Sequence, residues 1–349
     1  MTTHILATGA SLDLESIAFP GKSRAEKPEA SAHARQPAIA RDEILVVAKR
    51  SRLERDMQKK NISEDESVQY YNNLGESGLS ILASHLCQKE AADVCRAELS
   101  DGQVIRIEEL EERQKSGRYK LIVSLGGDDF FKVVSHHLQE GQSLLGVNSD
   151  PTLSRGVLLP TKYGQLPEAF KAITAGDYRL EPWTRLRLRI DGKDCGPATN
   201  EIALGKRDFR RMSRHLLEYR GEKVLQRSSG MLISTGVGST GWFASAGLYL
   251  GLGDRSFPKS APFARFELRE PYVSFEERDG VRRPVLPKFV EGTINPGEVL
   301  RITSLNDDEG LASRDDAFDE IKFPRGSVAE VSVDPNPLMV LMPNEREVV

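Results

Sequence analysis

An apolar run that ends in two glycines and two acids constrains the possible folds most strongly. Residues 121–131 read LIVSLGGDDFF. The run from Leu121 to Leu125 is typical of a buried strand, and the residues from Phe130 to Leu138 predict a helix. Gly126 and Gly127 let the backbone turn sharply and let another molecule approach its N–H groups. The stretch therefore predicts a strand, a tight turn and a helix in succession.

The turn also carries two candidate functional side chains, Asp128 and Asp129. The start of a helix attracts phosphate, because its free N–H groups and its dipole are positive there. A carboxylate at that place can hold Mg²⁺ or accept a proton from a hydroxyl group. Glycine and aspartate are equally common in turns that do no chemistry, so the turn alone leaves both interpretations open.

Size and charge limit the class of protein. A chain of 349 residues predicts one large or two ordinary domains. The formal net charge of -4 argues against a nucleic-acid partner, which would require a basic field. The three cysteines have no zinc-ligand spacing and fit a reducing cytosol, so we expect a cytoplasmic protein. No apolar run approaches the roughly 18 residues of a membrane helix, so no membrane partner is expected.

The pattern of apolar residues changes along the chain. Residues 1–40 are expected to form a disordered tail, because residues 22–36 mix Ala, Pro, Glu, Lys, Ser and Arg with little apolar content. Over residues 41–160, apolar runs such as 44–48 and 144–148 alternate with helical patterns. This alternation predicts an α/β fold, a doubly wound nucleotide-binding domain in which ligands sit beyond the carboxyl ends of the strands. Lys49–Arg52 falls at such an end, either as a solvated helix start or as an edge that faces phosphate.

The second half alternates with a period of two. Arg185–Ile190 reads RLRLRI, which predicts a half-buried strand with one basic face. We expect residues 161–330 to form a mainly β, sandwich-like domain. The C-terminal segment, residues 331–349, contains an apolar run and is expected to dock on the first domain.

Two later motifs add polar groups at strand ends. Asn200 and Glu201 stand together at a strand start, and an amide and a carboxylate can bind a nucleotide edge or ribose hydroxyls. Residues 234–242 read STGVGSTGW, a loop that could present N–H and hydroxyl groups to phosphate or ribose. Each motif is also compatible with an ordinary connection. His136 and His137 are expected to be solvated helix residues, with no partner that would form a metal site or a catalytic triad.

Taken in order, four of these motifs make the chain similar to the NAD kinase family. They are GGDD at 126–129, GVN at 146–148, NE at 200–201 and VGSTG at 237–241. Residues 146–160, which read GVNSDPTLSRGVLLP, resemble the mitochondrial NAD kinase 2 branch most closely. The likeness spans roughly residues 42 to 345. It implies an α/β domain followed by a β-rich dinucleotide-binding domain, in a homodimer or a higher homo-oligomer.

The resemblance also implies a reaction and a set of site residues. Such an enzyme transfers the γ-phosphoryl group of ATP, or of polyphosphate, to the 2′-hydroxyl of the NAD adenosine ribose with Mg²⁺ or another divalent cation. Asp128 would be the catalytic base, and Asp129 a metal ligand. ATP phosphates would contact Gly126, Gly127, Gly238 and Ser239. NAD would contact Asn148, Asn200, Glu201, Arg227, Ser229, Thr240, Trp242 and Ser245.

The chain departs from the family at Asp129 and Phe130, where the family has Gly and Thr. A carboxylate beside triphosphate would repel it by about 4 kcal/mol at 4 Å and an effective dielectric constant near 20. The departure predicts reduced use of ATP, unless a metal or a basic partner offsets the charge. Two alternatives stay open: a non-catalytic dinucleotide-binding regulator, and a kinase of the same fold that phosphorylates another hydroxyl. The donor and the choice between NAD and NADH are left open too.

Overall fold

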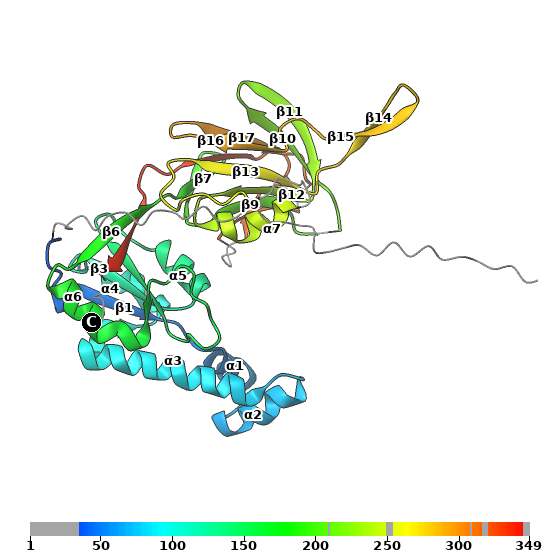
Figure 1. Cartoon of the computed structure of the whole chain (residues 1–349). Coiled ribbons are helices and arrows are strands. Elements are labelled where there is room, and N and C mark those ends of the chain that lie inside the picture. Colours follow the sequence, from blue (N-terminus) through cyan, green and yellow to red (C-terminus); the bar gives the residue numbers. More distant parts are fainter. Residues whose placement is uncertain (1–34, 209, 249–253, 308, 316–319, 345–349) are drawn as a thin grey trace, which may run out of the picture. The chain divides into compact units, whose positions relative to one another are not determined.

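A computed structural model describes residues 35–208, 210–248, 254–307, 309–315 and 320–344 (Figure 1). The tail expected over residues 1–40 lies outside these ranges up to residue 34. Its last residues pack against the first domain instead. The Gln36 N–H donates to the carbonyl of Gly176, Pro37 accepts a hydrogen bond from the hydroxyl of Tyr178, and Ile39 is buried. The expected boundary at residue 40 is therefore a few residues too late.

The first domain is built on one mixed sheet, in the order β2-β1-β3-β4-β21-β6, with β5 beside β4. All of its pairs are parallel except the pair of β21 and β6. The strands are β1 (Ile44–Ala48), β2 (Val104–Ile105), β3 (Leu121–Gly126), β4 (Ser143–Asn148), β5 (Thr161–Lys162), β6 (Tyr178–Trp183) and β21 (Leu338–Pro343). The parallel pairs confirm the expected α/β class, and β21 lies between β4 and β6.

Six helices of the described chain belong to this domain (Figure 1). They are α1 (Arg52–Lys60), α2 (Glu64–Asn73), α3 (Gly78–Glu98), α4 (Ile107–Gln114), α5 (Asp128–Ser135) and α6 (Leu166–Thr174). Side chains of α3 and α6 share one apolar cluster with the sheet, and those of α4 and α5 share another. The central strands are thus buried on both faces, which explains their unbroken apolar runs.

Local sequence signals explain where several helices begin. Ser51 and Ser63 cap the N-termini of α1 and α2. In each case the glutamate three residues later accepts a hydrogen bond from the backbone N–H of the serine, which completes a capping box. The helix expected from Phe130 begins two residues earlier, at Asp128, because Gly127 is extended and takes the capping position. The strand β2 is only two residues long, and α3 before it continues to Glu98.

The second domain contains two packed sheets of antiparallel strands. One has the order β11-β10-β17-β20-β7-β8, and the other β16-β13-β12-β9-β18-β19. The first sheet contains β7 (Leu186–Ile190), β8 (Lys193–Ala198), β10 (Ser213–Tyr219), β11 (Glu222–Ser228), β17 (Val299–Ser304) and β20 (Val328–Val333). The second contains β9 (Glu201–Lys206), β12 (Gly230–Ser234), β13 (Ala264–Arg269), β16 (Glu291–Ile294), β18 (Gly310–Arg314) and β19 (Ile321–Lys322). One apolar cluster joins the two sheets, as in a sandwich.

A hairpin, a single turn and a short helix accompany the sandwich. The hairpin of β14 (Ser274–Arg278) and β15 (Val281–Val285) extends from the sandwich (Figure 1). The short helix α7 (Trp242–Gly247) follows β12 through a single turn, η5 (Gly238–Thr240). In β7 the three aliphatic residues are buried, while Arg187 is half-buried and Arg189 exposed, so the predicted alternation is confirmed. No helix of the described residues is both long and apolar enough to span a bilayer.

Candidate functional site

The glycine turn at the end of β3 opens into a basic cavity. The cavity has a volume of about 400 Å³. Gly126, Gly127, Asp128 and Asp129 form one wall. Lys49, Arg52 and Arg55 are the cations among its other lining residues, which also include a third acid, Asp150. The expected phosphate-facing role of Lys49–Arg52 therefore gains a geometric basis at the carboxyl ends of β1 and β3.

The two glycines of the turn have different constraints. A Cβ atom on Gly126 would lie 2.8 Å from Cδ1 of the Phe130 ring, so this position has no room for a side chain. A Cβ atom on Gly127 would meet only the Ser154 hydroxyl, at 3.8 Å. Gly126 therefore serves the packing of α5 on β3, and the space beside Gly127 stays open for a ligand.

Asp128, the candidate base, holds the loop that follows β4. Its Oδ2 accepts a hydrogen bond from the N–H of Val157 at 3.0 Å, and its Oδ1 from that of Leu158 at 2.8 Å. A carboxylate has about four lone-pair sites, so two acceptor positions remain for a substrate hydroxyl. The side chain is thus both fixed in direction and able to accept a proton.

Asp129 has a basic partner that the sequence did not reveal. Its Oδ1 lies 3.1 Å from Nζ of Lys132, one turn further along α5. The Asp129 side chain is 89% exposed, whereas the Lys132 side chain is only 7% exposed. Lys132 is therefore a basic partner that offsets the charge of Asp129. The predicted repulsion between Asp129 and a triphosphate is weaker as a result.

Lys132 also connects the turn to the second motif. Burial disfavours its charge, but the hydrogen bond and charge of Asp129, with the charges of Glu201 and Asp315, raise the pKa of Lys132 above its ordinary value. This ammonium group stays protonated near neutral pH. The Lys132 ammonium thus interacts both with Asp129 of the glycine turn and with the charge of Glu201 in the Asn-Glu pair.

Asp315 fixes the backbone of that pair. Its carboxylate is buried and accepts hydrogen bonds from the N–H groups of Thr199 at 2.7 Å, Asn200 at 2.6 Å and Glu201 at 3.0 Å. The Asn200 side-chain oxygen is buried and has no hydrogen-bond partner among the described residues. A buried acceptor without a donor is costly, so Asn200 is poised to accept from a ligand.

His136 contacts the buried carboxylate of Asp315. Its Nε2 lies 2.7 Å from Oδ2 of Asp315, and its side chain is nearly buried. The expected solvated position is wrong, because the partner stands far away in the sequence. A second contact beside it joins the hydroxyls of Ser135 and Thr199 at 2.8 Å. The end of α5 is thereby fixed to the start of β9.

The loop after β12 is packed more tightly than a free phosphate loop. The Ser239 hydroxyl is buried and donates to the carbonyl of Gly236 at 2.8 Å. A Cβ atom on Gly238 would lie 2.6 Å from the Asn200 carbonyl and 2.8 Å from Oε2 of Glu201. Neither Gly238 nor Ser239 lines the basic cavity. Both residues support the Asn-Glu pair, and their predicted contact with ATP phosphates stays a prediction.

Asn148 organises the loop on the other side of the turn. Its side-chain amide donates to the carbonyl of Ser154 at 2.9 Å and accepts from the N–H of Asp150 at 3.0 Å. Gly156 has a φ of 61° and no space for a Cβ, which would lie 2.6 Å from the Asn148 Nδ2. Asn148 lines the basic cavity, so the structure brings it to the turn.

The other predicted dinucleotide contacts lie around the ends of β11, β12 and β13. The Ser229 hydroxyl donates to the carboxylate of Glu270. The Arg269 guanidinium lies 4.8 Å from the centre of the Trp242 ring. Arg227, Thr240 and Ser245 are exposed and do not line the basic cavity. Their predicted role stays a prediction.

Two lysines near the turn have lowered pKa values. Burial lowers the pKa of Lys49, and the neighbouring Arg55 adds to this effect, while Asp129 opposes it. Burial also lowers the pKa of Lys259, whose charge is favoured by Glu181 and Asp128. The Lys259 Nζ lies 4.1 Å from the centre of the Trp183 ring. Of the two, only Lys49 lines the cavity, where a multiply charged anion would stabilise its ammonium group.

A metal site made by the protein alone is not found among the described residues, where no group of three His, Cys, Asp or Glu side chains is arranged to hold an ion. Magnesium usually needs only one or two carboxylates when substrate phosphates supply the other ligands. The exposed Asp129 carboxylate at the cavity wall fits that requirement. The residues present are therefore compatible with an ion held chiefly by a nucleotide.

Comparison with known proteins agrees with this geometry. No family model matches the chain. An NAD kinase of Methanopyrus kandleri is 33% identical over 129 residues, which are 36% of this chain and 46% of that protein. A probable NADH kinase of Oryza sativa is 23% identical over 286 residues, 73% of this chain and 81% of that protein. The mitochondrial NAD kinase 2 of Rattus norvegicus is 26% identical over 168 residues, 46% of this chain and 40% of that protein. The chain thus spans about half the length of the archaeal relative and less of the rat one.

Solved structures support the fold. The yeast NADH kinase complexed with NADH aligns with a TM-score of 0.50 and 17% identity, over 66% of this chain and 65% of that one. Fold and site together define a two-domain α/β protein with a glycine turn that faces a basic cavity. The sequence matches make the chain similar to NAD kinases and NADH kinases, the resemblance that the motifs implied.

Proposed function

We propose that this protein is an NAD kinase that phosphorylates the 2′-hydroxyl of the NAD adenosine ribose. The observation that carries the proposal is the basic cavity over the Gly-Gly-Asp-Asp turn. It combines open backbone N–H groups, three cations and three carboxylates, those of Asp128, Asp129 and Asp150, at the carboxyl end of a parallel sheet. This combination suits a nucleoside triphosphate beside a hydroxyl acceptor.

In this proposal the triphosphate lies against Gly127 and between the cations of the cavity. Lys49, Arg52 and Arg55 neutralise its charge, and binding keeps Lys49 protonated in spite of its burial. The charge of Asp129 is offset by Lys132, and Mg²⁺ would be held chiefly by the phosphates. The ion would add positive charge beside the transferred phosphoryl group, where such charge accelerates transfer.

The acceptor hydroxyl lies beside Asp128. One oxygen of the carboxylate accepts the hydroxyl proton while its two backbone hydrogen bonds keep the side chain in place. The dinucleotide extends along α5 toward Asn200, whose unpaired amide oxygen accepts a hydrogen bond from it. Glu201 and the residues around Trp242 complete the dinucleotide site. The enzyme works as a homo-oligomer in the cytoplasm.

The test is a coupled assay for NADP⁺ made from NAD⁺, with ATP and Mg²⁺ and then with polyphosphate. Formation of NADP⁺ with either donor supports the proposal, and the better donor answers the question that the sequence left open. NADH as acceptor is assayed in parallel. If NAD⁺ binds in calorimetry but no donor yields product, the chain is a dinucleotide-binding regulator. If NAD⁺ does not bind at all, the result favours the alternative of a kinase that phosphorylates another hydroxyl.

A further inference from the structure

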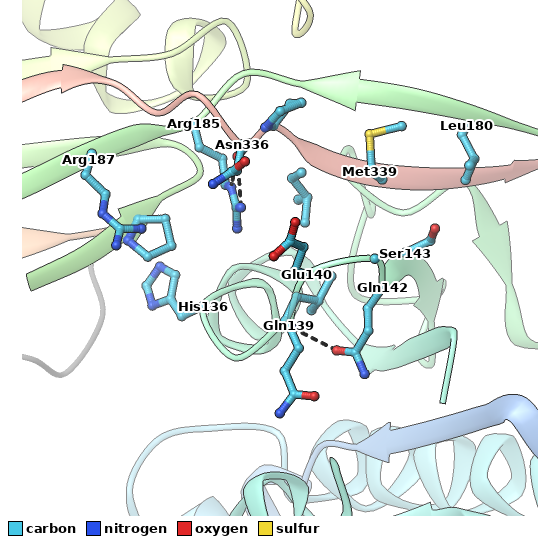
Figure 2. Close-up of a pocket in the computed structure, with 15 residues that line it drawn as sticks. His136, Gln139, Glu140, Gln142, Ser143, Leu180, Arg185, Arg187, Asn336 and Met339 are labelled. Atoms are coloured by element: carbon cyan, nitrogen blue, oxygen red, sulfur yellow. Dashed lines mark hydrogen bonds between the residues drawn. The ribbon is translucent and has the colours of Figure 1, made fainter. Parts of the chain in front are cut away.

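A second cavity lies at the other end of α5, away from the glycine turn. Its volume is about 420 Å³, which suits a small organic molecule. Its walls come from the end of α5 and the start of β4, from β7, and from the segment that leads into β21 (Figure 2). None of its lining residues belongs to the basic cavity beside Gly127.

Arg185 is the central polar group of this cavity. Its Nε and Nη2 both donate to the carbonyl of Asn336, at 3.1 and 2.9 Å. Within the described part of the chain it forms no salt bridge, although Arg187 beside it is paired with Asp194 and Asp334. Burial lowers the pKa of Arg185, and the charge of Asp334 only partly offsets this effect. A half-buried guanidinium without a carboxylate in contact leaves part of its binding capacity unused.

Part of the cavity wall is apolar. Leu138, Leu180 and Met339 line it together with Pro337 and Leu338. A bare inorganic ion would leave this wall in contact with water, whereas an organic body would cover it. The cavity therefore offers one strong site for an anionic group and a surface for an apolar remainder.

Two features oppose an anion here. Glu140 lies at the cavity, and Figure 2 shows its carboxylate facing the same space as the Arg185 guanidinium. The end of α5 also presents partly negative carbonyl groups. Glu140 is exposed, so its carboxylate can turn toward water when a ligand enters. His136 lines the cavity as well, but its Nε2 already contacts Asp315.

We propose that this cavity is a second binding site, for a small organic molecule that carries a carboxylate or phosphate group on an apolar body. The anionic group pairs with Arg185, and the apolar body lies on the wall formed by Leu138, Leu180 and Met339. The site is separate from the glycine turn and does not depend on the activity proposed above.

The test is calorimetric titration of the purified full chain with phenyl phosphate, phenylacetate and inorganic phosphate. We expect saturable binding of at least one aromatic anion, and the tighter of the two identifies the preferred group. Inorganic phosphate should bind more weakly than phenyl phosphate, because it cannot cover the apolar wall. Equal affinities for these two phosphates, or no saturable binding of either aromatic anion, would overturn the proposal.

Three variants assign the binding to this cavity. Arg185→Gln should weaken it about tenfold or more, since an ionic hydrogen bond is lost. Glu140→Gln should strengthen it severalfold, because the opposing charge is removed. Arg189→Gln makes the same charge change on the exposed part of β7 outside the cavity and should have no effect. If Arg185→Gln disturbs the fold, the other two variants still test the proposal: the affinity should rise in Glu140→Gln and stay unchanged in Arg189→Gln. An affinity that Glu140→Gln leaves unchanged or lowers would contradict the proposal.

Discussion

Nζ of Lys132 lies 3.1 Å from Oδ1 of Asp129, so the unusual acid of the glycine turn shares its charge with a buried lysine. Without that lysine, Asp129 would stand unpaired beside a bound triphosphate. We expect Lys132→Gln to raise the KM for ATP about fivefold, a value that allows for solvent screening of an exposed carboxylate. Adding Asp129→Asn to this variant should restore the KM. Steady-state kinetics of the four proteins across a Mg²⁺ series measure both effects.

The single change Asp129→Asn is the control for that cycle, and we expect it to alter the KM for ATP by less than about threefold, as Lys132 already offsets the charge. A large gain in ATP use would mean that the carboxylate does repel the donor. A large loss that additional Mg²⁺ overcomes would instead identify Asp129 as a metal ligand.

Phe130, the other departure from the family, has a structural role. Its ring covers Gly126, and its side chain is buried in the cluster between α5 and the sheet. We expect Phe130→Thr to lower the free energy of unfolding by about 3 kcal/mol through lost burial and a residual cavity. Urea denaturation measures it, with Phe130→Leu as a milder control. A loss below about 1 kcal/mol would show that the turn tolerates the family residue.

Asp128 should be needed for turnover more than for binding. We expect Asp128→Asn to lower kcat by at least about 10²-fold, because an amide cannot accept the hydroxyl proton. The variant keeps one acceptor for the N–H groups of Val157 and Leu158, so its loop should be loosened but present. The NAD⁺ affinity, measured by calorimetry, should change little. Near-native turnover would exclude Asp128 as the base.

Asn200 offers a test of dinucleotide binding with little structural cost. Because its Oδ1 has no hydrogen-bond partner among the described residues, removing it should not destabilise the fold. We expect Asn200→Ala to weaken NAD⁺ binding by about 1–3 kcal/mol, through the donor that it leaves unpaired on the ligand. Calorimetry and thermal denaturation of the same samples separate the two quantities. An unchanged affinity would make the pair purely structural.

His215 predicts how stability depends on pH. The side chain is fully buried, and burial lowers its pKa from 6.5 to about 4. The unfolded chain binds a proton at this residue below about pH 6.5, whereas the folded chain does so only near pH 4. The free energy of unfolding should therefore decrease as the pH is lowered from about 6.5 to about 4. The loss is about 3 kcal/mol at 1.36 kcal/mol per pKa unit, and above pH 6.5 the stability contributed by the neutral imidazole is fully present.

The measurement is urea denaturation at pH 7, 5.5 and 4, for the native chain and for His215→Gln. Glutamine can accept the hydrogen bond that the Asn306 amide shares with the imidazole at 3.1 Å, and it does not titrate. Carboxylates contribute the same loss in both proteins, so only the difference reports on His215. Parallel pH profiles would show that the imidazole is not responsible.

The local parts of this structure could be predicted, and the distant contacts could not. The apolar run that ends in Gly126 predicts a buried strand, and the capping pair of Ser63 and Glu66 predicts the start of a helix. Both signals come from residues that are neighbours in the sequence. His136 gave no such signal, since its partner Asp315 stands in another domain. Lys132 stands only one turn from Asp129, yet its burial depends on long-range packing. The sequence thus indicates the local elements, but not the distant contacts that support them.

The position of β21 has a consequence for biosynthesis. This last strand lies between β4 and β6, so the first sheet cannot be completed until the β-rich domain has been translated. The nascent chain must carry β4 and β6 with unpaired edges while the ribosome makes the sandwich. Exposed edges of apolar strands recruit other chains, and this interval is the one in which the protein most needs a chaperone.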